Sequence, residues 1–299
     1  MRVTVLGGTI FVGRAVVEEL VAAGHDVTVV HRGEHEPDDG FPDVEHVHGD
    51  RAALPAIDAD AVVDCRAVSR ADVEGVLRAV PDVPTVVLSS VDVYPALAGL
   101  QSGTVTCDVP IDESTPVRTE RFPYRGVIPG MDEYEKLDCE ELYLDRGGIV
   151  LRLPFVVGPH DYQRREDFVL RRVRAGDATM PIGGGNLLAS RVLVRDVGTA
   201  VVATLAASIE REVFVLAEQP TSTVREWCEA IIEAAGSTME LVQVPDDELP
   251  EDLGLTATHQ QHLLVSPAKA MAMLGWRPTP WRDAVRESVA WHLTHPPVG

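Results

Sequence analysis

Near its N-terminus the chain reads Val3-Thr4-Val5-Leu6-Gly7-Gly8-Thr9-Ile10-Phe11-Val12-Gly13. A short β-branched run ends there in paired glycines, and an amphipathic segment from Ala15 to Ala23 follows at once. Strand, glycine turn and helix in this order are typical of a doubly wound sheet, in which the first helix directs its free amides at a dinucleotide diphosphate. Glycine suits such a turn because a Cβ would obstruct the approach of the phosphates. The segment predicts a dinucleotide cradle; an ordinary strand–helix turn that binds nothing is the alternative.

Segments of strand and helix character alternate along the N-terminal half. Runs rich in Val, Ile and Leu predict strands near 2–6, 27–31, 44–48, 60–64, 84–89 and 148–153, and apolar periodicity predicts helices near 11–23, 69–80 and 131–146. Residues 95–130 are rich in Pro, Gly, Ser and Thr, which predicts a long functional loop. This alternation predicts an α/β fold, a Rossmann-type doubly wound parallel sheet.

After Pro154 the pattern changes to arginine-rich helix, glycine loop and shorter α/β segments, which predict a smaller C-terminal α/β lobe. We expect residues 1–158 to form an NAD(P)-binding Rossmann domain to which 190–216 return. Residues 159–189 and 217–299 would then form the substrate-binding lobe. Ligands of such sheets bind beyond the carboxyl ends of the strands, so we expect the site in the cleft between the two parts.

The chain is strongly acidic. Its 299 residues carry 26 Lys and Arg against 47 Asp and Glu, a formal net charge of −21, and its lysines are Lys136 and Lys269. Such a surface repels nucleic acid and anionic membranes at long range, so we expect neither as a partner. It also suits a halophilic protein, because high salt screens the self-repulsion. A preference for Arg over Lys that stems from base composition is the alternative.

Cysteine spacing and hydropathy bear on the compartment. Four cysteines lie far apart without a CxxC pair, which suits reduced thiols better than a disulfide framework or a zinc site. No apolar run approaches the roughly 20 residues that span a bilayer, and the N-terminus lacks the basic and apolar pattern of a secretory signal. We therefore expect a cytoplasmic protein.

Five segments together resemble the extended short-chain dehydrogenase/reductase family, the group of NAD(P)-dependent epimerases and dehydratases. They are the glycine motif at 7–13, Leu88-Ser89-Ser90-Val91-Asp92-Val93-Tyr94, Leu151-Arg152-Leu153-Pro154-Phe155-Val156-Val157-Gly158-Pro159, Arg191-Val192-Leu193-Val194-Arg195-Asp196-Val197 and Leu274-Gly275-Trp276-Arg277-Pro278. Each is weak alone, but all five occur in the family's order and span nearly the whole chain. The resemblance implies a nicotinamide cofactor and hydride transfer on a small polar substrate, such as a sugar derivative.

The chain departs from the family's pattern at two places. Ile10 stands where the glycine motif usually has its middle glycine, and a β-branched residue there disfavours positive φ and narrows the approach to the diphosphate. The family's acid/base pair is Tyr-x-x-x-Lys on one helix face, in which the tyrosine moves the proton. Lys136 and Glu140 match the lysine end of that motif, but Asp132 stands four residues before Lys136.

Tyr134 is the tyrosine nearest to Lys136 in the sequence, two residues away. On an ideal helix the two side chains would point about 200° apart and would not share a face. Either the helix begins irregularly and Tyr134 reaches the site, or Tyr124 or Asp132 is the acid/base residue. Ser90, Tyr134 and Lys136 are the catalytic candidates; a catalytically retired scaffold is the alternative.

The second strand and the resemblance predict the cofactor contacts. That strand ends at His31-Arg32-Gly33 without an acid for the adenine ribose, and Arg32 is placed to pair with a 2′-phosphate, so we expect NADP in preference to NAD. The resemblance further implies that Lys136 binds the nicotinamide ribose and that Asp50 contacts the adenine. The predicted cofactor-binding residues are Gly7, Gly8, Thr9, Ile10, Phe11, Gly13, Arg32, Asp50, Ser89, Lys136, Pro154 and Phe155.

Substrate-binding candidates are Ser90, Tyr124 and Arg191, of which Ser90 would hold the substrate oxygen and Arg191 a diphosphate, as in relatives. The histidines lack carboxylate or thiolate partners at metal-site spacing, so no metal is expected. We therefore predict an NAD(P)-dependent oxidoreductase or epimerase/dehydratase with a small-molecule substrate. The rivals are a non-catalytic NADP-binding sensor or scaffold and an RNA-associated protein, which the net charge disfavours. A homodimer is expected by analogy with relatives.

Overall fold

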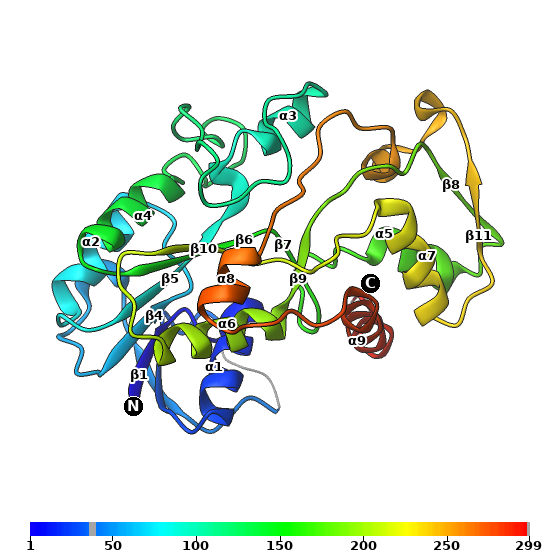
Figure 1. Cartoon of the computed structure of the whole chain (residues 1–299). Coiled ribbons are helices and arrows are strands. Elements are labelled where there is room, and N and C mark those ends of the chain that lie inside the picture. The colour runs from blue at the N-terminus through cyan, green and yellow to red at the C-terminus, as the bar shows by residue number, and fades with distance from the viewer. Residues whose placement is uncertain (36–39, 298–299) are drawn as a thin grey trace.

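A seven-stranded parallel sheet forms the centre of the larger part of the molecule (Figure 1). The computed structural model describes residues 1–35 and 40–297. The strands follow the order β10-β6-β5-β4-β1-β2-β3, in which the chain moves outward from β1 to one edge and then to the other. Their bounds are β1 (Arg2–Leu6), β2 (Asp26–His31), β3 (Glu45–His48), β4 (Ala61–Asp64), β5 (Thr85–Ser90), β6 (Ile149–Leu153) and β10 (Val213–Val215). The predicted Rossmann-type sheet is confirmed.

Helices cover both faces of this sheet (Figure 1). Helices α1 (Phe11–Ala22) and α6 (Val194–Ala206) pack together on one face, and α2 (Arg70–Ala79) and α4 (Lys136–Asp145) pack on the other. Alternate strand residues therefore face different cores: Val3 and Val5 contact the α1 and α6 side, whereas Leu6 contacts the α2 side. Because both faces are covered, the strands are apolar almost without interruption.

The C-terminal lobe has its own core and a two-stranded parallel sheet of β8 (Thr179–Ile182) and β11 (Glu240–Gln243). Helices α5 (Asp167–Ala175), α7 (Val224–Ala234) and α9 (Trp281–Thr294) contribute side chains to this core. The short turns η3 (Asp246–Glu248) and η4 (Glu251–Thr256) also belong to this lobe. A second parallel pair, β7 (Phe155–Val157) with β9 (Arg191–Leu193), lies where the chain crosses between the two parts. Helix α8 (Ala268–Met273) returns to the larger part, where Ala270 and Trp276 join the core of the sheet. The exact domain division remains a prediction.

Two segments differ from the sequence-based expectation. Helix α4 begins at Lys136 instead of 131, because Glu135 has an extended backbone and its carboxylate accepts a hydrogen bond from the amide of Leu137 at 3.0 Å. The predicted loop 95–130 contains a short helix, α3 (Ala96–Ser102), which ends at Gly103 in a left-handed conformation. The turns η1 (Arg51–Ala53) and η2 (Val91–Val93) follow β3 and β5. The delayed start of α4 determines where Tyr134 lies.

Within residues 1–35 and 40–297, no helix combines the length and the apolar composition that crossing a membrane requires.

Candidate functional site

The glycine turn between β1 and α1 is closely packed. Gly7 has φ +81°, in the left-handed region, and a Cβ on Gly13 would overlap the carbonyl oxygen of Gly7. A Cβ on Gly8 would lie 2.9 Å from the Val17 side chain. The three glycines of the motif thus allow the first turn of α1 to sit against the end of β1.

Ile10 fits this turn without strain. Its backbone is extended, with φ −133°, and the positive φ expected at the middle glycine falls on the next residue, Phe11, at +41°. The Ile10 side chain is 45% exposed and makes no capping hydrogen bond, and the first turn of α1 contains no acidic residue. Among the described residues, no side chain caps the N-terminus of α1, so its first amides are open to an anion.

A cavity of about 370 Å³ lies beside this turn, beyond the carboxyl ends of β1, β2 and β4. It has the position that dinucleotides occupy in doubly wound sheets. Its lining includes Gly7, Thr9, Ile10, Arg32 and Asp50 of the predicted set. Gly8, Phe11 and Gly13 belong to the turn and the start of α1 but are not among the residues that line the cavity.

Three arginines line the cavity and differ in how they are paired. Arg51 pairs with the buried Asp64, which also accepts a hydrogen bond from Tyr143 at 2.5 Å. Arg32 pairs with Glu34 at 2.7 Å at the cavity edge. Arg66 has no ion-pair partner among the described residues, and its Cβ lies over Gly7, within 3.2 Å of where a Gly7 Cβ would stand. Arg66 is thus the cavity arginine free to meet a ligand anion.

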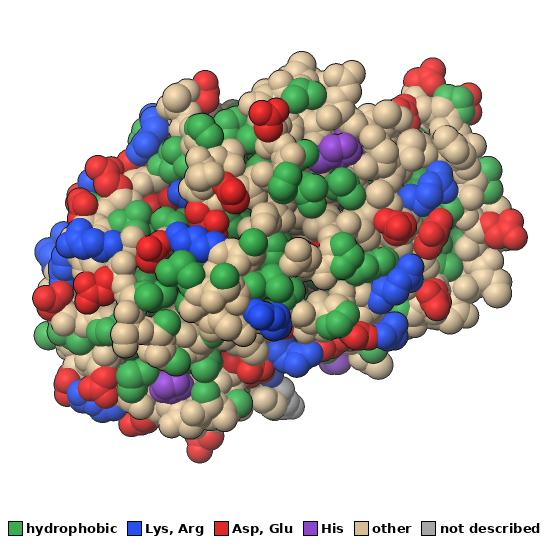
Figure 2. Space-filling model, viewed as in Figure 1, with side chains coloured by type: hydrophobic (Ala, Val, Ile, Leu, Met, Phe, Trp, Pro, Cys, Tyr) green, Lys and Arg blue, Asp and Glu red, His purple; other side chains and the backbone are tan. Residues whose placement is uncertain are grey.

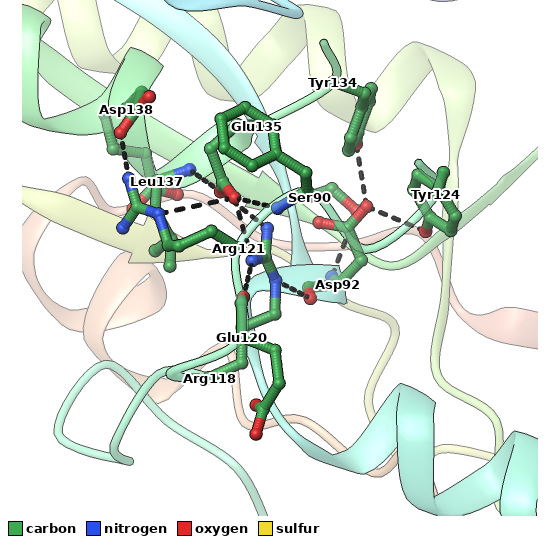
Figure 3. Close-up of polar contacts among 12 residues, drawn as sticks. Ser90, Asp92, Arg118, Glu120, Arg121, Tyr124, Tyr134, Glu135, Leu137 and Asp138 are labelled. Carbon is green, nitrogen blue, oxygen red and sulfur yellow. Dashed lines mark hydrogen bonds and ion pairs between the residues drawn. The ribbon is translucent and has the colours of Figure 1, made fainter. Parts of the chain in front are cut away.

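A second cluster of polar side chains gathers at the end of β5 (Figure 3). The hydroxyls of Tyr134 and Tyr124 both donate to Asp92 Oδ2, at 2.7 and 3.1 Å, and their rings pack edge to face with centroids 5.0 Å apart. Ser90 Oγ accepts a hydrogen bond from the Asp92 amide at 3.1 Å, so Ser90 and Tyr134 both contact Asp92. Ser90, Tyr134 and Tyr124 are brought together, around an aspartate that the sequence did not indicate.

An ion pair fixes the two tyrosines relative to β5. Arg118 donates to both Glu135 carboxylate oxygens, at 2.7 and 3.1 Å, and the Phe122 amide donates to Glu135 at 2.7 Å (Figure 3). Burial opposes ionisation of Glu135, but these bonds outweigh it and hold the pKa of its carboxyl below the usual value. The same carboxylate caps α4, so one residue ties the loop of Tyr124 to the helix start beside Tyr134.

Lys136 is buried next to this cluster. Its Nζ donates to the carbonyl oxygens of Ala67 at 2.5 Å and Leu88 at 3.1 Å, and lies 5.8 Å from the centre of the Tyr134 ring. Burial lowers the pKa of the Lys136 ammonium. An ammonium has three donors, so two carbonyls leave one for a further acceptor.

Other predicted residues lie elsewhere. Ser89 is buried and its hydroxyl donates to Glu140 at 2.5 Å, so it faces away from the cavity. Arg191 is buried beside Glu218, donates to Ser222 Oγ at 2.7 Å and stacks on the Trp227 ring, which leaves it inside the C-terminal lobe. Asp50 lines the cavity and also caps η1 through the Ala52 amide.

Pro154 marks the break between β6 and β7, and Phe155 is half-buried at the start of β7 between two hydrophobic cores. Asp132, the alternative acid/base residue, is exposed and accepts a hydrogen bond from the Gly126 amide at 2.9 Å. Across the described ranges, no group of three or more His, Cys, Asp or Glu side chains is arranged to hold a metal ion.

Two residues of the site were not anticipated. Asp92 lies inside the quoted Ser-Ser-x-x-x-Tyr segment, and Arg66 follows β4, but neither position carries a sequence signal of its own. Each offers its residue type as the one available cue: Asp92 is a carboxylate two residues after the end of β5, and Arg66 is a cation two residues after the end of β4.

The comparisons with known proteins support the fold resemblance. No family model matches the chain. A curated relative, the chloroplast stem-loop binding protein of 41 kDa b of Arabidopsis thaliana, is 26% identical over 93% of this chain and 75% of its own length.

Solved structures match the whole fold at low identity. A UDP-glucose 4-epimerase has a TM-score of 0.75 at 17% identity, covering 99% of this chain and 98% of that one. A dTDP-glucose 4,6-dehydratase from Bacillus anthracis, solved with NAD, has a TM-score of 0.69 at 16% identity, covering 98% and 97%. The enzyme WbmH from Bordetella bronchiseptica, solved with NAD⁺, has the same score and identity, covering 98% of both chains. The chain therefore has the fold of the nucleotide-sugar epimerases and dehydratases.

Proposed function

We propose that this protein is an NAD(P)-dependent oxidoreductase or epimerase/dehydratase that acts on a small polar, sugar-derived substrate. The observation that carries the proposal is the placement of two sites at one sheet edge. A cavity beside the glycine turn suits a dinucleotide, and the Ser90–Tyr134–Tyr124 cluster stands at the end of β5, three strands from β2 in the sheet order.

The chain's own residues fit a nicotinamide dinucleotide. Amides of the first turn of α1 and the glycine turn leave room for backbone contact with a diphosphate, and Arg66, without an ion-pair partner in residues 1–35 and 40–297, lines the same cavity. Lys136 keeps one donor for a ribose hydroxyl. When bound, the nicotinamide would accept or donate the hydride.

The residues around a substrate would position its oxygen and handle its proton. Ser90 and Tyr134 both contact Asp92 and would both contact a substrate oxygen, with Tyr134 as the proton carrier. The similar structures include a UDP-glucose 4-epimerase and a dTDP-glucose 4,6-dehydratase, which suggests a sugar nucleotide as the substrate class.

The preference for NADP over NAD rests on Arg32. A 2′-phosphate would compete with Glu34 for the Arg32 guanidinium, and His35 lines the same edge of the cavity. We expect NADPH to bind more tightly than NADH, by a smaller margin than an unpaired arginine would give.

Isothermal titration calorimetry of the protein with NADPH and with NADH tests the proposal. We expect binding of both in the micromolar range or tighter, with NADPH favoured. Absence of binding for both cofactors would contradict the proposed function. A stem-loop RNA is the third ligand, because the curated relative is a stem-loop binding protein. Since the net charge of this chain is −21, we expect it not to bind the RNA at moderate salt.

A further inference from the structure

One oxygen of Asp92 receives two phenol hydrogen bonds, and the other receives none. Tyr134 and Tyr124 share Oδ2, whereas Oδ1 is buried without a hydrogen-bond partner in the described part of the chain (Figure 3). Asp92 as a whole is only 6% exposed. A buried carboxylate oxygen left open is uncommon and destabilising, and such groups concentrate where function requires them.

Lys136 is poorly placed to control the Tyr134 proton. Its Nζ is bonded to two main-chain carbonyls and faces the ring of Tyr134, while the phenol hydroxyl points to Asp92. In the Tyr-x-x-x-Lys arrangement the cation stabilises a phenolate. Here the Asp92 carboxylate accepts a hydrogen bond from the Tyr134 phenol, which favours the protonated phenol. Before Tyr134 can take a proton from a substrate, another group must therefore accept the proton that the phenol already carries.

We propose that Asp92 is the proton acceptor behind Tyr134, so that the two residues form a relay in place of the Tyr–Lys pair. The proposal rests on the proposed hydride-transfer function. On oxidation of a substrate alcohol, the C–H bond breaks and its hydride goes to NAD(P)⁺. The O–H proton goes to Tyr134 Oη, and the Tyr134 proton goes to Asp92 Oδ2, which becomes a neutral carboxylic acid. Reduction reverses the same transfers. Asp92 acts through Tyr134 and is a positioning residue.

The surroundings of Asp92 are consistent with this role. Two cations face Asp92. Arg118 Nε donates to the Asp92 main-chain oxygen at 3.1 Å, and the positive charge of Lys136 interacts with the Asp92 carboxylate. Neither cation donates to the carboxylate, which therefore stays able to accept a proton. Burial, and after it the charge and hydrogen bond of Asp92, raise the pKa of Tyr134 and of Tyr124 well above the usual value.

The first test needs neither cofactor nor substrate. Tyrosine ring ¹³Cζ NMR is recorded against pH for the wild type, Asp92→Asn and the control Asp132→Asn, with Tyr134→Phe and Tyr124→Phe to assign the signals. Asparagine keeps the shape of the acceptor but removes its charge. We expect the ionisation midpoints of Tyr134 and Tyr124 to fall by about one unit or more in Asp92→Asn and to stay unchanged in Asp132→Asn. Unchanged midpoints in Asp92→Asn would overturn the proposal.

If Asp92→Asn does not fold, Tyr124→Phe decides the same point. Removing Tyr124 should shift the Tyr134 midpoint, because Tyr124 shares Asp92 Oδ2 with Tyr134 and its own charge raises the pKa of Tyr134. A Tyr134 midpoint that does not respond would show that the two phenols do not share the carboxylate, against the proposal.

The second test is kinetic, with UDP-glucose as the probe substrate. We expect Asp92→Asn to lower kcat by about 100-fold or more, with KM and the NADPH Kd within about threefold. The double variant with Tyr134→Phe should lose little more than either single variant. A kcat within about threefold of the wild type in Asp92→Asn would overturn the relay. Wild-type protein that binds NADPH but does not convert UDP-glucose would contradict the proposed substrate class instead, and the tyrosine titration then decides the role of Asp92.

Discussion

At the scale of single residues, the glycine turn has the least tolerance. We expect Gly13→Ala to destabilise the protein by about 1–3 kcal/mol, because its Cβ would overlap the Gly7 carbonyl oxygen and force α1 away from β1. Urea unfolding measures the loss, and calorimetry with NADPH should show weakened binding. Gly254→Ala is the matched control, since a Cβ there meets nothing within 4 Å. Equal stability of the two variants would contradict the packing argument.

Arg66 and Arg32 should affect cofactor binding in different ways. Arg66 lines the cavity beside Gly7, where we propose that the diphosphate binds, so we expect Arg66→Gln to weaken NADPH and NADH alike, by about 10-fold or more. Arg32→Gln should weaken NADPH and leave NADH nearly unchanged. Arg78→Gln, on α2 and outside the cavity lining, serves as the control. If Arg66→Gln weakened the binding of NADPH alone, Arg66 would instead be assigned to the 2′-phosphate.

At the scale of elements, the contact between α5 and α9 contains a buried acid and a buried base. Glu166, just before α5, accepts a hydrogen bond from Ser288 of α9 at 2.7 Å, and its other oxygen lies 3.5 Å from His292 Nε2. Burial raises the pKa of Glu166 to about 7 and lowers the pKa of His292 to about 4. Both groups are therefore held in their neutral forms near pH 6.

The raised pKa makes this contact pH-dependent with a definite sign. Because the folded pKa of Glu166 exceeds its unfolded value of 4.5, its contribution is fully present below pH 4.5 and is lost as the pH rises through 7. We expect Glu166→Gln to be more stable than the wild type at pH 8 by roughly 2–3 kcal/mol relative to the same comparison at pH 4.5. Urea unfolding at the two pH values measures it, with the exposed Glu248→Gln as control. Parallel pH dependence in the wild type and Glu166→Gln would refute the assignment.

At the scale of the whole molecule, charge is the dominant feature. Acidic side chains are spread over the face in Figure 2 with fewer basic ones between them, in keeping with the net charge of −21. Many arginines are engaged in ion pairs, such as Arg171 and Arg172 with Asp252. We propose that the protein is adapted to high salt.

Salt should therefore stabilise the protein. We expect its Tm to rise from low to molar KCl, because the Debye length falls from about 10 Å at 0.1 M to about 3 Å at 1 M and the repulsion between surface carboxylates is screened. Differential scanning calorimetry measures the Tm, and sucrose separates screening from exclusion effects, since it carries no charge. A Tm that is flat or falls over this range would count against adaptation to salt.

The sequence by itself determined the sheet and the glycine turn. Alternating apolar runs and glycine spacing are local patterns, and a strand or a packed turn is specified within a few residues. The six strands predicted in the N-terminal half were therefore correct to within one residue, and Gly7, Gly8 and Gly13 form the expected tight turn. Tertiary structure decided the chemistry at the end of β5. The start of α4 depends on Glu135, whose partner Arg118 is 17 residues away, and Asp92 meets Tyr134 across 42 residues. No helical or strand period carries such long-range pairing, so the sequence left Tyr134, Tyr124 and Asp132 open, and only the folded chain turned two tyrosines toward Asp92.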